Sequence, residues 1–227
     1  MSEPDLLQLE PNIYAYPGEM RLTRPWVGVV VTPEGTVLID SGNGPRHAEA
    51  IQAELQGLNA PPVSHILLTH HHWDHVFGNC TFPTAHIVAH DLTQKHLHVM
   101  ESEPWSAEYV EAQGERFPRG KMVALMMKKA IPDWSSFRAV AAHETFTERY
   151  ELRLGGYHFV MEHVGGQHEP DHCIVHVTPG NVLFLGDATY GRGMKVEWNL
   201  PALAETMQGF LATGAAWFVE GHRPPVQ

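Results

Sequence analysis

The sequence predicts a single domain with αββα or αβ layers, in which mixed β-sheets lie in the middle and helices lie outside. One observation behind this prediction is a series of short apolar runs separated by turn residues, which is typical of strands. Another is that two segments have apolar residues at helical spacing. In addition, potential metal ligands follow several of the strand-like runs, so we expect a site on the loops at strand ends.

Nine runs have the length and the apolar content of strands. Pro33, Glu34 and Gly35 lie between the second and the third run, where a hairpin turn is expected. The nine runs span residues 12–16, 27–32, 36–40, 65–69, 86–89, 157–164, 173–178, 182–185 and 216–219.

The first helical segment covers residues 45–58, and its apolar residues fall on one face, at Ala48, Ile51, Leu55 and Leu58. The second runs from residue 91 to about residue 138 and is flanked by Pro and Trp residues. We therefore expect a helical cap, about residues 91–147, inserted into one domain of residues 1–227. A stripe in this cap predicts core packing, with a substrate-facing lid as the alternative because Met side chains adapt to pockets. The stripe consists of Val123, Met126, Met127 and Ala130.

Composition and charge limit the class of protein and the kinds of partner it can have. The chain has 227 residues, of which 43% are hydrophobic and 18% charged, as in an ordinary soluble globular protein. It carries 15 basic and 26 acidic residues, and the net charge of −11 argues against a nucleic-acid or anionic-membrane partner. A small-molecule substrate is therefore expected, and the sequence leaves the oligomeric state open.

The cysteines and the N-terminus bear on the compartment. Cys80 and Cys173 form no closely spaced pair, so the sequence predicts neither a disulfide framework nor a Cys-rich zinc site. The acidic N-terminus lacks the apolar core of a signal peptide. No apolar run approaches the ~20 residues of a membrane span. These features together predict a cytoplasmic protein.

Residues 69–75 read Thr-His-His-His-Trp-Asp-His and follow an apolar run directly. Buried His and Asp are costly without partners, so this density of ligands exceeds what a core accommodates. In the spacing His70-x-His72-x-Asp74-His75, two imidazoles can converge on one ion while the Asp and the last His turn toward a second. Imidazole and carboxylate are ligands that zinc takes. The motif therefore predicts a metal site, with a His-rich surface turn as the alternative.

Later strand ends supply further potential ligands. The run at 157–164 is followed by a turn-rich segment with His168, and the run at 182–185 ends in Gly186 and Asp187. The last run is followed by Glu220, Gly221 and His222. Each of these alone is weak, because a His after a strand is commonly a hydrogen-bonded structural residue. Their repetition in this order indicates one site, and glycine lets the backbone approach an ion closely.

On these motifs, the chain resembles the metallo-β-lactamase-fold hydrolase superfamily over nearly its whole length. The resemblance implies an α/β fold, a four-layer αββα sandwich with a helical insertion. The second motif, residues 67–75, is most similar to its form in glyoxalase II, a thioesterase. The five motifs of the family correspond to Asp40, residues 70–75, His168, Asp187 and His222.

The resemblance also implies a dinuclear centre bridged by Asp187, with Asp40 orienting a ligand imidazole. The implied cofactors are two divalent ions, Zn²⁺ first, with Fe or Mn as alternatives because the same ligands accept them. The implied ligands of the first ion are His70, His72 and His168, and those of the second are Asp74, His75 and His222.

The resemblance implies that such a centre belongs to a metal-dependent hydrolase, in which a metal-bridging hydroxide attacks a small ester, thioester or lactone. Asp74 would hold the nucleophile by a hydrogen bond as well as ligate. Tyr190 stands where N-acyl homoserine lactonases carry a Tyr, which implies an oxyanion or leaving-group donor; packing on the site wall is the alternative. His71 is expected to face solvent or to lie behind the ligands, and His172 to be structural or to line the pocket.

Two departures from the family pattern bear on the pocket. Gln167 stands where a glycine commonly precedes the third-motif His, and Glu169, Pro170 and Asp171 replace a turn of small residues. The sequence also ends five residues after His222, where glyoxalase II carries its substrate-binding helices. We therefore expect the helical cap to shape the pocket instead.

Other functions remain open at the level of sequence. One is a mononuclear iron enzyme that resembles the persulfide dioxygenases, and another is a phosphodiesterase or RNA-processing nuclease, which the acidic charge disfavours. A metal-storing module is a further alternative. The sequence does not name the substrate, because specificity depends on pocket shape and a few polar groups.

Overall fold

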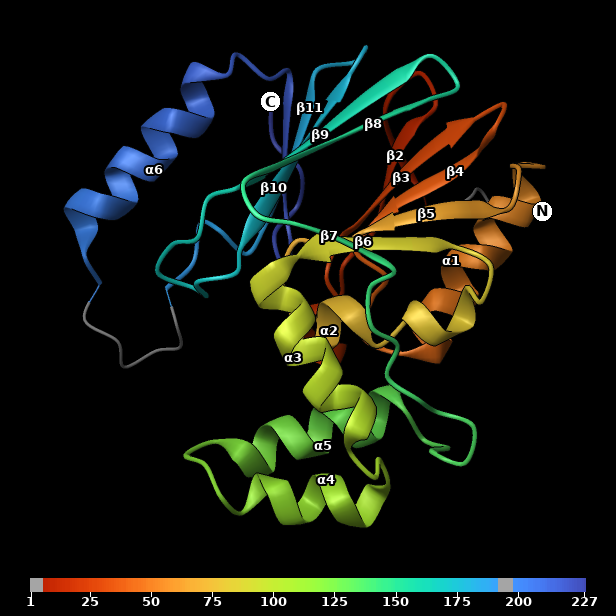
Figure 1. The fold of residues 1–227 in the computed structure, drawn as a ribbon, viewed down its shortest axis with the longest axis vertical. Helices are drawn as coiled ribbons and strands as arrows, with labels where there is room; N and C mark the ends of the chain where they lie inside the picture. The colour runs from red at the N-terminus through yellow and green to blue at the C-terminus, as the bar shows by residue number, and fades with distance from the viewer. Residues whose placement is uncertain (1–5, 192–197) are drawn as a thin grey trace.

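The computed structural model describes residues 6–191 and 198–227. Two β-sheets pack face to face and helices cover their outer faces, as Figure 1 shows, so the predicted four-layer αββα arrangement is confirmed. The seven-stranded sheet has the order β1-β2-β3-β4-β5-β6-β7 and the five-stranded sheet the order β12-β11-β10-β9-β8. The strands of the first sheet are Leu7–Glu10, Ile13–Tyr16, Val27–Thr32, Gly35–Ile39, Val63–Leu67, His86–His90 and Glu144–Phe146. Those of the second, β8 to β12, are Arg149–Leu154, Tyr157–His163, Cys173–Thr178, Val182–Gly186 and Trp217–Glu220.

The helices lie beside the two sheets or in the inserted cap. Helices α1 and α3 border the seven-stranded sheet, and α6 lies beside the five-stranded sheet (Figure 1). Helices α3, α4 and α5 fill the connection between β6 and β7, where the sequence predicts the inserted cap. Within the described residues, no helix is long and apolar enough to cross a bilayer. The helices α1 to α6 are Pro45–Gly57, Trp73–Val76, Asp91–Ser102, Ala107–Gly114, Gly120–Ala130 and Leu200–Ala212.

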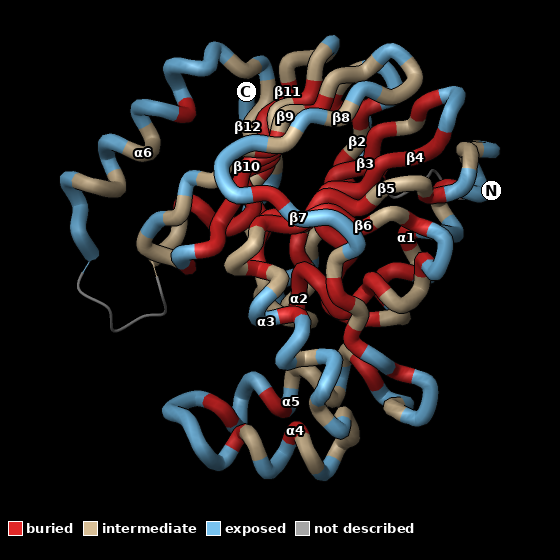
Figure 2. Tube along the Cα trace, viewed as in Figure 1, coloured by how far each residue is buried: buried red, intermediate tan, exposed pale blue. Residues whose placement is uncertain are grey.

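One core cluster lies between the two sheets, where side chains of both inner faces interdigitate. Figure 2 shows this buried zone running through the centre of the molecule, whereas α6 is largely exposed and the α4–α5 hairpin has buried, intermediate and exposed residues. A second cluster packs the other face of the seven-stranded sheet against α1, α2 and α3. The sheet is therefore covered on both faces and forms a rigid support for the loops at its edge. Residues of the core between the sheets include Ile13, Val30, Leu67, Phe159, Val175 and Phe184.

Strand direction brings the loops of the two sheets to one place. Strands β4 and β5 are parallel, with Ile39 paired to Leu67, so the chain leaves both strands at the same edge. Strands β11 and β12 are also parallel, with Gly186 paired to Glu220. The carboxyl ends of these four strands, together with that of β9, which runs in the same direction as β11, carry the candidate site.

All nine predicted strands are present, with ends that shift by at most two residues. The structure adds β1, β7, β8 and the helix α6, which the sequence analysis did not identify. Met127 and Ala130 of the predicted stripe on α5 pack against the core. The prediction was wrong at Val123, which is 40% exposed, whereas Gly120 and Ala124 are buried. The reason is the close approach of α4: a Cβ on Gly120 would lie 2.3 Å from the carbonyl oxygen of Gly114. Small residues, and not the Met-rich stripe, therefore mark the face of α5 that meets α4.

Candidate metal centre

The structure brings the seven predicted metal ligands into two adjoining groups. In the part of the chain that the structure describes, the ligand atoms of each group lie within 4.8 Å of one another. Sequence-distant loops therefore converge, the His-rich loop after β5 with the loops after β9, β11 and β12. The first group is His70, His72, His168 and Asp187, and the second is Asp74, His75 and His222.

Asp187 lies between the two groups. Its Oδ2 atom is 3.3 Å from Nε2 of His168 in the first group and 3.5 Å from Nε2 of His222 in the second. Its Oδ1 atom is 3.6 Å from Nε2 of His75. This position between two imidazole sets is the one that the sequence analysis expects for a bridging carboxylate.

Glycines leave room for this carboxylate. A Cβ on Gly221 would lie 2.2 Å from Oδ1 of Asp187 and 3.0 Å from Cε1 of His75. Gly186, just before Asp187, has φ +50°, and a Cβ there would lie 2.6 Å from Oγ1 of Thr69. Both glycines at these strand ends are therefore required by close packing around the site.

Asp40 fixes two of the histidines from behind. Its Oδ2 atom accepts hydrogen bonds from Nδ1 of His75 at 2.7 Å and from Oγ1 of Thr69 at 2.8 Å. Oγ1 of Thr69 in turn lies 3.0 Å from Nδ1 of His70, so Nε2 of both His70 and His75 is left to face the site. Asp40 has φ 63°, a conformation that costs about 1–3 kcal/mol for a non-glycine residue and persists where its surroundings fix it. Asp40 thus lies where the predicted orienting acid belongs.

The histidines and carboxylates of the site set each other's charge. Burial and the nearby His75 hold the pKa of His70 well below 6.5, so His70 is in the neutral form that binds ions. Burial also opposes charge on His222, but hydrogen bonds to Asp187 and Asp74 raise the pKa of His222 to about 9. Burial would raise the pKa of Asp187, yet the charge of His75 and the hydrogen bond to His222 hold it well below 3.8. A divalent ion would supply the same positive charge and displace the imidazole protons.

The donor atoms of the site fit a divalent metal. Nε2 of His70, Nε2 of His75 and Oδ1 of Asp187 are buried and make no hydrogen bond within the described residues. Buried polar atoms of this kind nearly always have a partner, so three of them facing one space indicate a ligand. Imidazole nitrogen and carboxylate oxygen are the donors that zinc, iron and manganese accept.

The sequence analysis missed two acids in this neighbourhood and left the role of a third residue open. Glu169 and Asp171, in the turn before β10, are buried and contact His72 and His71. His172 accepts a hydrogen bond from the backbone N–H of Asp187 at 2.9 Å, and its ring stacks on that of His70 at 4.6 Å. The only sequence signal for the two acids was their departure from the small-residue turn of the family.

Gln167 holds the third-motif loop against the start of α6. Its side-chain amide donates to the carbonyl oxygen of Asn199 at 2.9 Å and accepts from the N–H of the same residue at 2.8 Å. A glycine at this position could not make either bond. The departure at Gln167 therefore ties the His168 loop to the C-terminal helix.

Tyr190 borders both ligand groups. Its ring centroid is 6.4 Å from that of His168 and 6.3 Å from that of His222. Its hydroxyl donates to Oε2 of Glu220 at 2.9 Å, and Arg223 lies over its ring. Burial and the Glu220 carboxylate raise the pKa of Tyr190, so its hydroxyl stays protonated and able to donate.

His47 of α1 makes the metal-free protein sensitive to acid. It is fully buried, its Nδ1 accepts from the N–H of Asn43, and burial followed by the charge of Arg24 lowers its pKa to about 3. A folded-state pKa below the unfolded value of about 6.5 contributes stability above pH 6.5 that is lost as the pH falls toward 3. In His47→Asn, whose amide oxygen can accept the same bond, we expect a shallower loss of stability over this range.

The measurement is chemical denaturation of chelator-treated protein at several pH values between 3 and 6.5. The slope of unfolding free energy against pH should be smaller in the variant by up to ~1.4 kcal/mol per pH unit, the effect of one proton. His98→Asn, at an exposed histidine, is the matched control and should keep the wild-type slope. Equal slopes in all three proteins would contradict the prediction.

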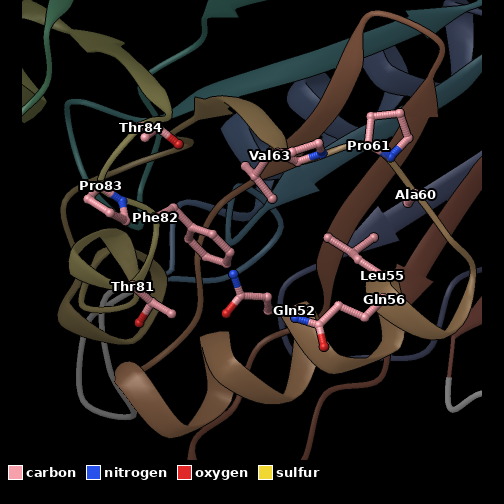
Figure 3. A pocket seen from close by; sticks show the side chains of 11 residues that line it. Gln52, Leu55, Gln56, Ala60, Pro61, Val63, Thr81, Phe82, Pro83 and Thr84 are labelled. Atoms are coloured by element: carbon pink, nitrogen blue, oxygen red, sulfur yellow. The ribbon is translucent and has the colours of Figure 1, made fainter.

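A separate pocket lies far along the sheet from these ligands. Figure 3 shows it between α1 and the segment after α2, lined by side chains such as Gln52, Leu55 and Phe82. It also contains Val63, the first residue of β5, whereas the His-rich loop follows the last residue of that strand. All of its lining side chains are apolar, amide or hydroxyl groups, so it lacks the acid–base and ligand chemistry of the metal centre.

Comparison with known proteins shows which family the sequence matches. A profile of the metallo-beta-lactamase superfamily matches residues 21–215. A probable metallo-hydrolase of Mycobacterium tuberculosis is 30% identical over 192 residues, covering 73% of this chain and 56% of that protein. The chain thus spans little more than half the length of the curated relatives it matches.

Solved structures show the same fold. A metallo-beta-lactamase family protein from Thermus thermophilus superposes with a TM-score of 0.68 at 20% identity, covering 96% of this chain and 76% of that one. A sec-alkylsulfatase from Pseudomonas sp. gives a TM-score of 0.68 at 17% identity, covering 97% and 38%. At such identities the likeness concerns the fold alone.

Proposed function

The chain belongs to the metallo-beta-lactamase superfamily, and on this basis we propose that it is a dinuclear metal-dependent hydrolase of a small ester, thioester or lactone. The observation that carries the proposal is Asp187, whose carboxylate lies within 3.6 Å of imidazoles from both ligand groups. Two bound divalent ions, Zn²⁺ in the simplest case, would polarise the substrate oxygen and lower the pKa of an attacking water.

The side chains of the site would position the reactants. The first group would be held by His70, His72 and His168, and the second by Asp74, His75 and His222, with Asp187 shared. Asp74 is buried, with Oδ2 3.2 Å from Nε2 of His222, and from this position it would orient the attacking water and take up its proton. Tyr190 would donate its hydroxyl proton to the oxygen on which negative charge develops.

The proposed substrate class rests on three features. The second motif is most similar to that of a thioesterase, and Tyr190 matches the lactonase position in sequence. The net charge of −11 disfavours a nucleic-acid phosphodiester. A small acyl compound with an ester, thioester or lactone bond satisfies all three.

Replacing Tyr190 with Phe tests its part in the reaction. The hydroxyl now donates to Glu220, so it would have to turn from this carboxylate to reach a substrate oxygen. We expect kcat to fall about 10- to 100-fold, at the lower end of what loss of one oxyanion donor costs, with metal content unchanged. Steady-state kinetics and elemental analysis of the same preparation measure both. Tyr157→Phe, which removes a hydroxyl that donates to the carbonyl of Pro11, is the control, and equal kcat in both variants would assign Tyr190 to packing.

The whole proposal is tested by elemental analysis of protein purified without added metal, followed by a panel of esters, thioesters and lactones. About two zinc or manganese ions per chain and turnover of one panel class are the expected results. About one iron per chain, with oxygen uptake on a persulfide, would overturn the proposal in favour of an oxygenase. Tight metal binding with no turnover of the panel would also count against it.

A further inference from the structure

Two buried acids from one turn contact two consecutive histidines of the His-rich loop. Oε1 of Glu169 lies 3.1 Å from Nε2 of His72, and Oδ2 of Asp171 lies 3.0 Å from Nδ1 of His71. Glu169 is 4% exposed and Asp171 is 1% exposed. Carboxylates are seldom buried to this extent unless they are paired, so these contacts define how the two loops meet.

We propose that Glu169 is a positioning residue. Its hydrogen bond to Nε2 of His72 leaves Nδ1 of His72 as the atom that binds the metal and orients this atom toward the first group. This proposal rests on the proposed function insofar as His72 is a metal ligand. A carboxylate can only accept a hydrogen bond, so Nε2 of His72 carries the hydrogen and Nδ1 keeps its lone pair. That Nδ1 atom lies 3.0 Å from Nε2 of His168, within the first group.

His72 needs such a partner more than its neighbours do. Its side chain is 30% exposed, whereas His70 and His75 are fully buried. Asp40 fixes those two, His75 directly and His70 through Thr69, whereas the hydrogen bond of His72 to an acid is made by Glu169. With Glu169, each of the three predicted ligands His70, His72 and His75 has one ring nitrogen in a hydrogen bond and the other left for an ion.

Asp171 has the complementary effect on His71. It accepts hydrogen bonds from both the backbone N–H and Nδ1 of His71, at 2.9 and 3.0 Å, and from Oγ1 of Thr93 at 2.8 Å. The His71 ring also stacks on His96, with centroids 3.8 Å apart. These contacts tie His71 to Asp171 and to α3. His71 lies outside the His70, His72, His168 and Asp187 group, although its ring and that of His72 form with Glu169 a third set of potential ligand atoms within 4.8 Å.

The first test needs no metal. In chelator-treated protein, imidazole nitrogen NMR reports which ring nitrogen of His72 carries the hydrogen, with His72→Asn used for assignment. We expect the Nε2–H form in the wild type and in Glu169→Gln, whose amide oxygen still accepts a bond. Glu169→Ala should show a mixture of the two forms. The Nε2–H form persisting at full population in Glu169→Ala would overturn the proposal.

The second test measures Zn²⁺ affinity by competition with a chromophoric chelator. Glu169→Ala should lower the Zn²⁺ affinity of the first group about 10- to 100-fold, which is the usual effect of removing a hydrogen-bond partner of a metal-bound His. The Zn²⁺ affinity of the second group should stay unchanged. Glu169→Gln should recover much of the loss, and Glu162→Ala, at a partly exposed acid on β9, should match the wild type. If Glu169→Ala fails to fold, Glu169→Asp, which shortens the side chain by one methylene, takes its place. Equal affinity in all variants would overturn the proposal.

These outcomes separate the positioning role from the proposed reaction. A wild type that hydrolyses none of the acyl panel, together with weaker first-group affinity in Glu169→Ala, supports the positioning role and contradicts the proposed function. A wild type that does hydrolyse the panel, with unchanged affinity and ring form in Glu169→Ala, overturns the positioning role alone.

Discussion

Asp187→Ala should bind less than one ion per chain and should lose hydrolytic activity by about 10³-fold or more. The carboxylate is 3% exposed and lies between His75, His168 and His222, so its removal takes a donor from both groups at once. Loss of the Lewis-acid contribution of metal ions is worth several kcal/mol, and each 1.36 kcal/mol is a factor of about ten in rate. Elemental analysis and kinetics on one preparation measure the two effects together.

The control for Asp187→Ala is Asp133→Ala, because Asp133 caps a surface turn by accepting from the N–H of Ser135. This variant should keep both the metal content and the rate. Circular dichroism of both proteins would exclude global unfolding as the cause of any loss. Two ions retained in Asp187→Ala would contradict a bridging role, whatever happens to the rate.

Asp74→Asn should give a different pattern, with a steep fall in rate but retention of the first ion. Oδ2 of Asp74 lies 3.2 Å from Nε2 of His222 and 3.9 Å from Nε2 of His75, both in the second group. Burial would raise the pKa of Asp74, but the hydrogen bond to His222 keeps it below 3.8, so the side chain is an ionised carboxylate that can accept a hydrogen bond from an attacking water. Loss of a positioned proton acceptor costs about 10²- to 10⁴-fold in rate.

The two variants distinguish the roles of the two acids. Asp74→Asn should retain about one ion and Asp187→Ala less than one, as measured by titration with zinc in the presence of a competing chelator. An Asp74→Asn protein that keeps the wild-type rate would contradict the mechanism. One that loses both ions would show that the groups do not bind independently.

Most of the strands could be predicted because burial on two sheet faces demands apolar residues. The central strand β3 is apolar along nearly its whole length, and its expected bounds at 27–32 agree with the structure. Strand β8 was missed because it lies at a sheet edge. Its half-buried side chains, Tyr150, Leu152 and Leu154, alternate with exposed Arg and Glu, so its apolar content is diluted. On α5, Met127 and Ala130 pack against the core as predicted, but Val123 is exposed because the close contact with α4 places Gly120 and Ala124 at the buried positions.

The predicted ligands could be found because each follows a strand-like run and belongs to a short motif, as His168 and Asp187 do. The residues that hold the ligands carry no such local pattern. Glu169 is 97 residues from His72 along the chain, and Asp171 is 100 residues from His71. Such pairings depend on how two loops meet in space, which spacing along a single sequence does not encode. Asp40 was predicted only because the family motif includes it.

The origin of the ligands in two different sheets couples metal supply to the survival of the folded chain. His70, His72, Asp74 and His75 follow β5 of one sheet, whereas His168, Asp187 and His222 follow strands of the other. Ions bound between them would act as cross-links that the unfolded chain cannot hold. By mass action, free metal at 100 times its dissociation constant would add about 2.7 kcal/mol to the free energy of unfolding. In a metal-starved cell, the protein would therefore meet proteases in its unfolded form more often, and its abundance would fall together with its activity.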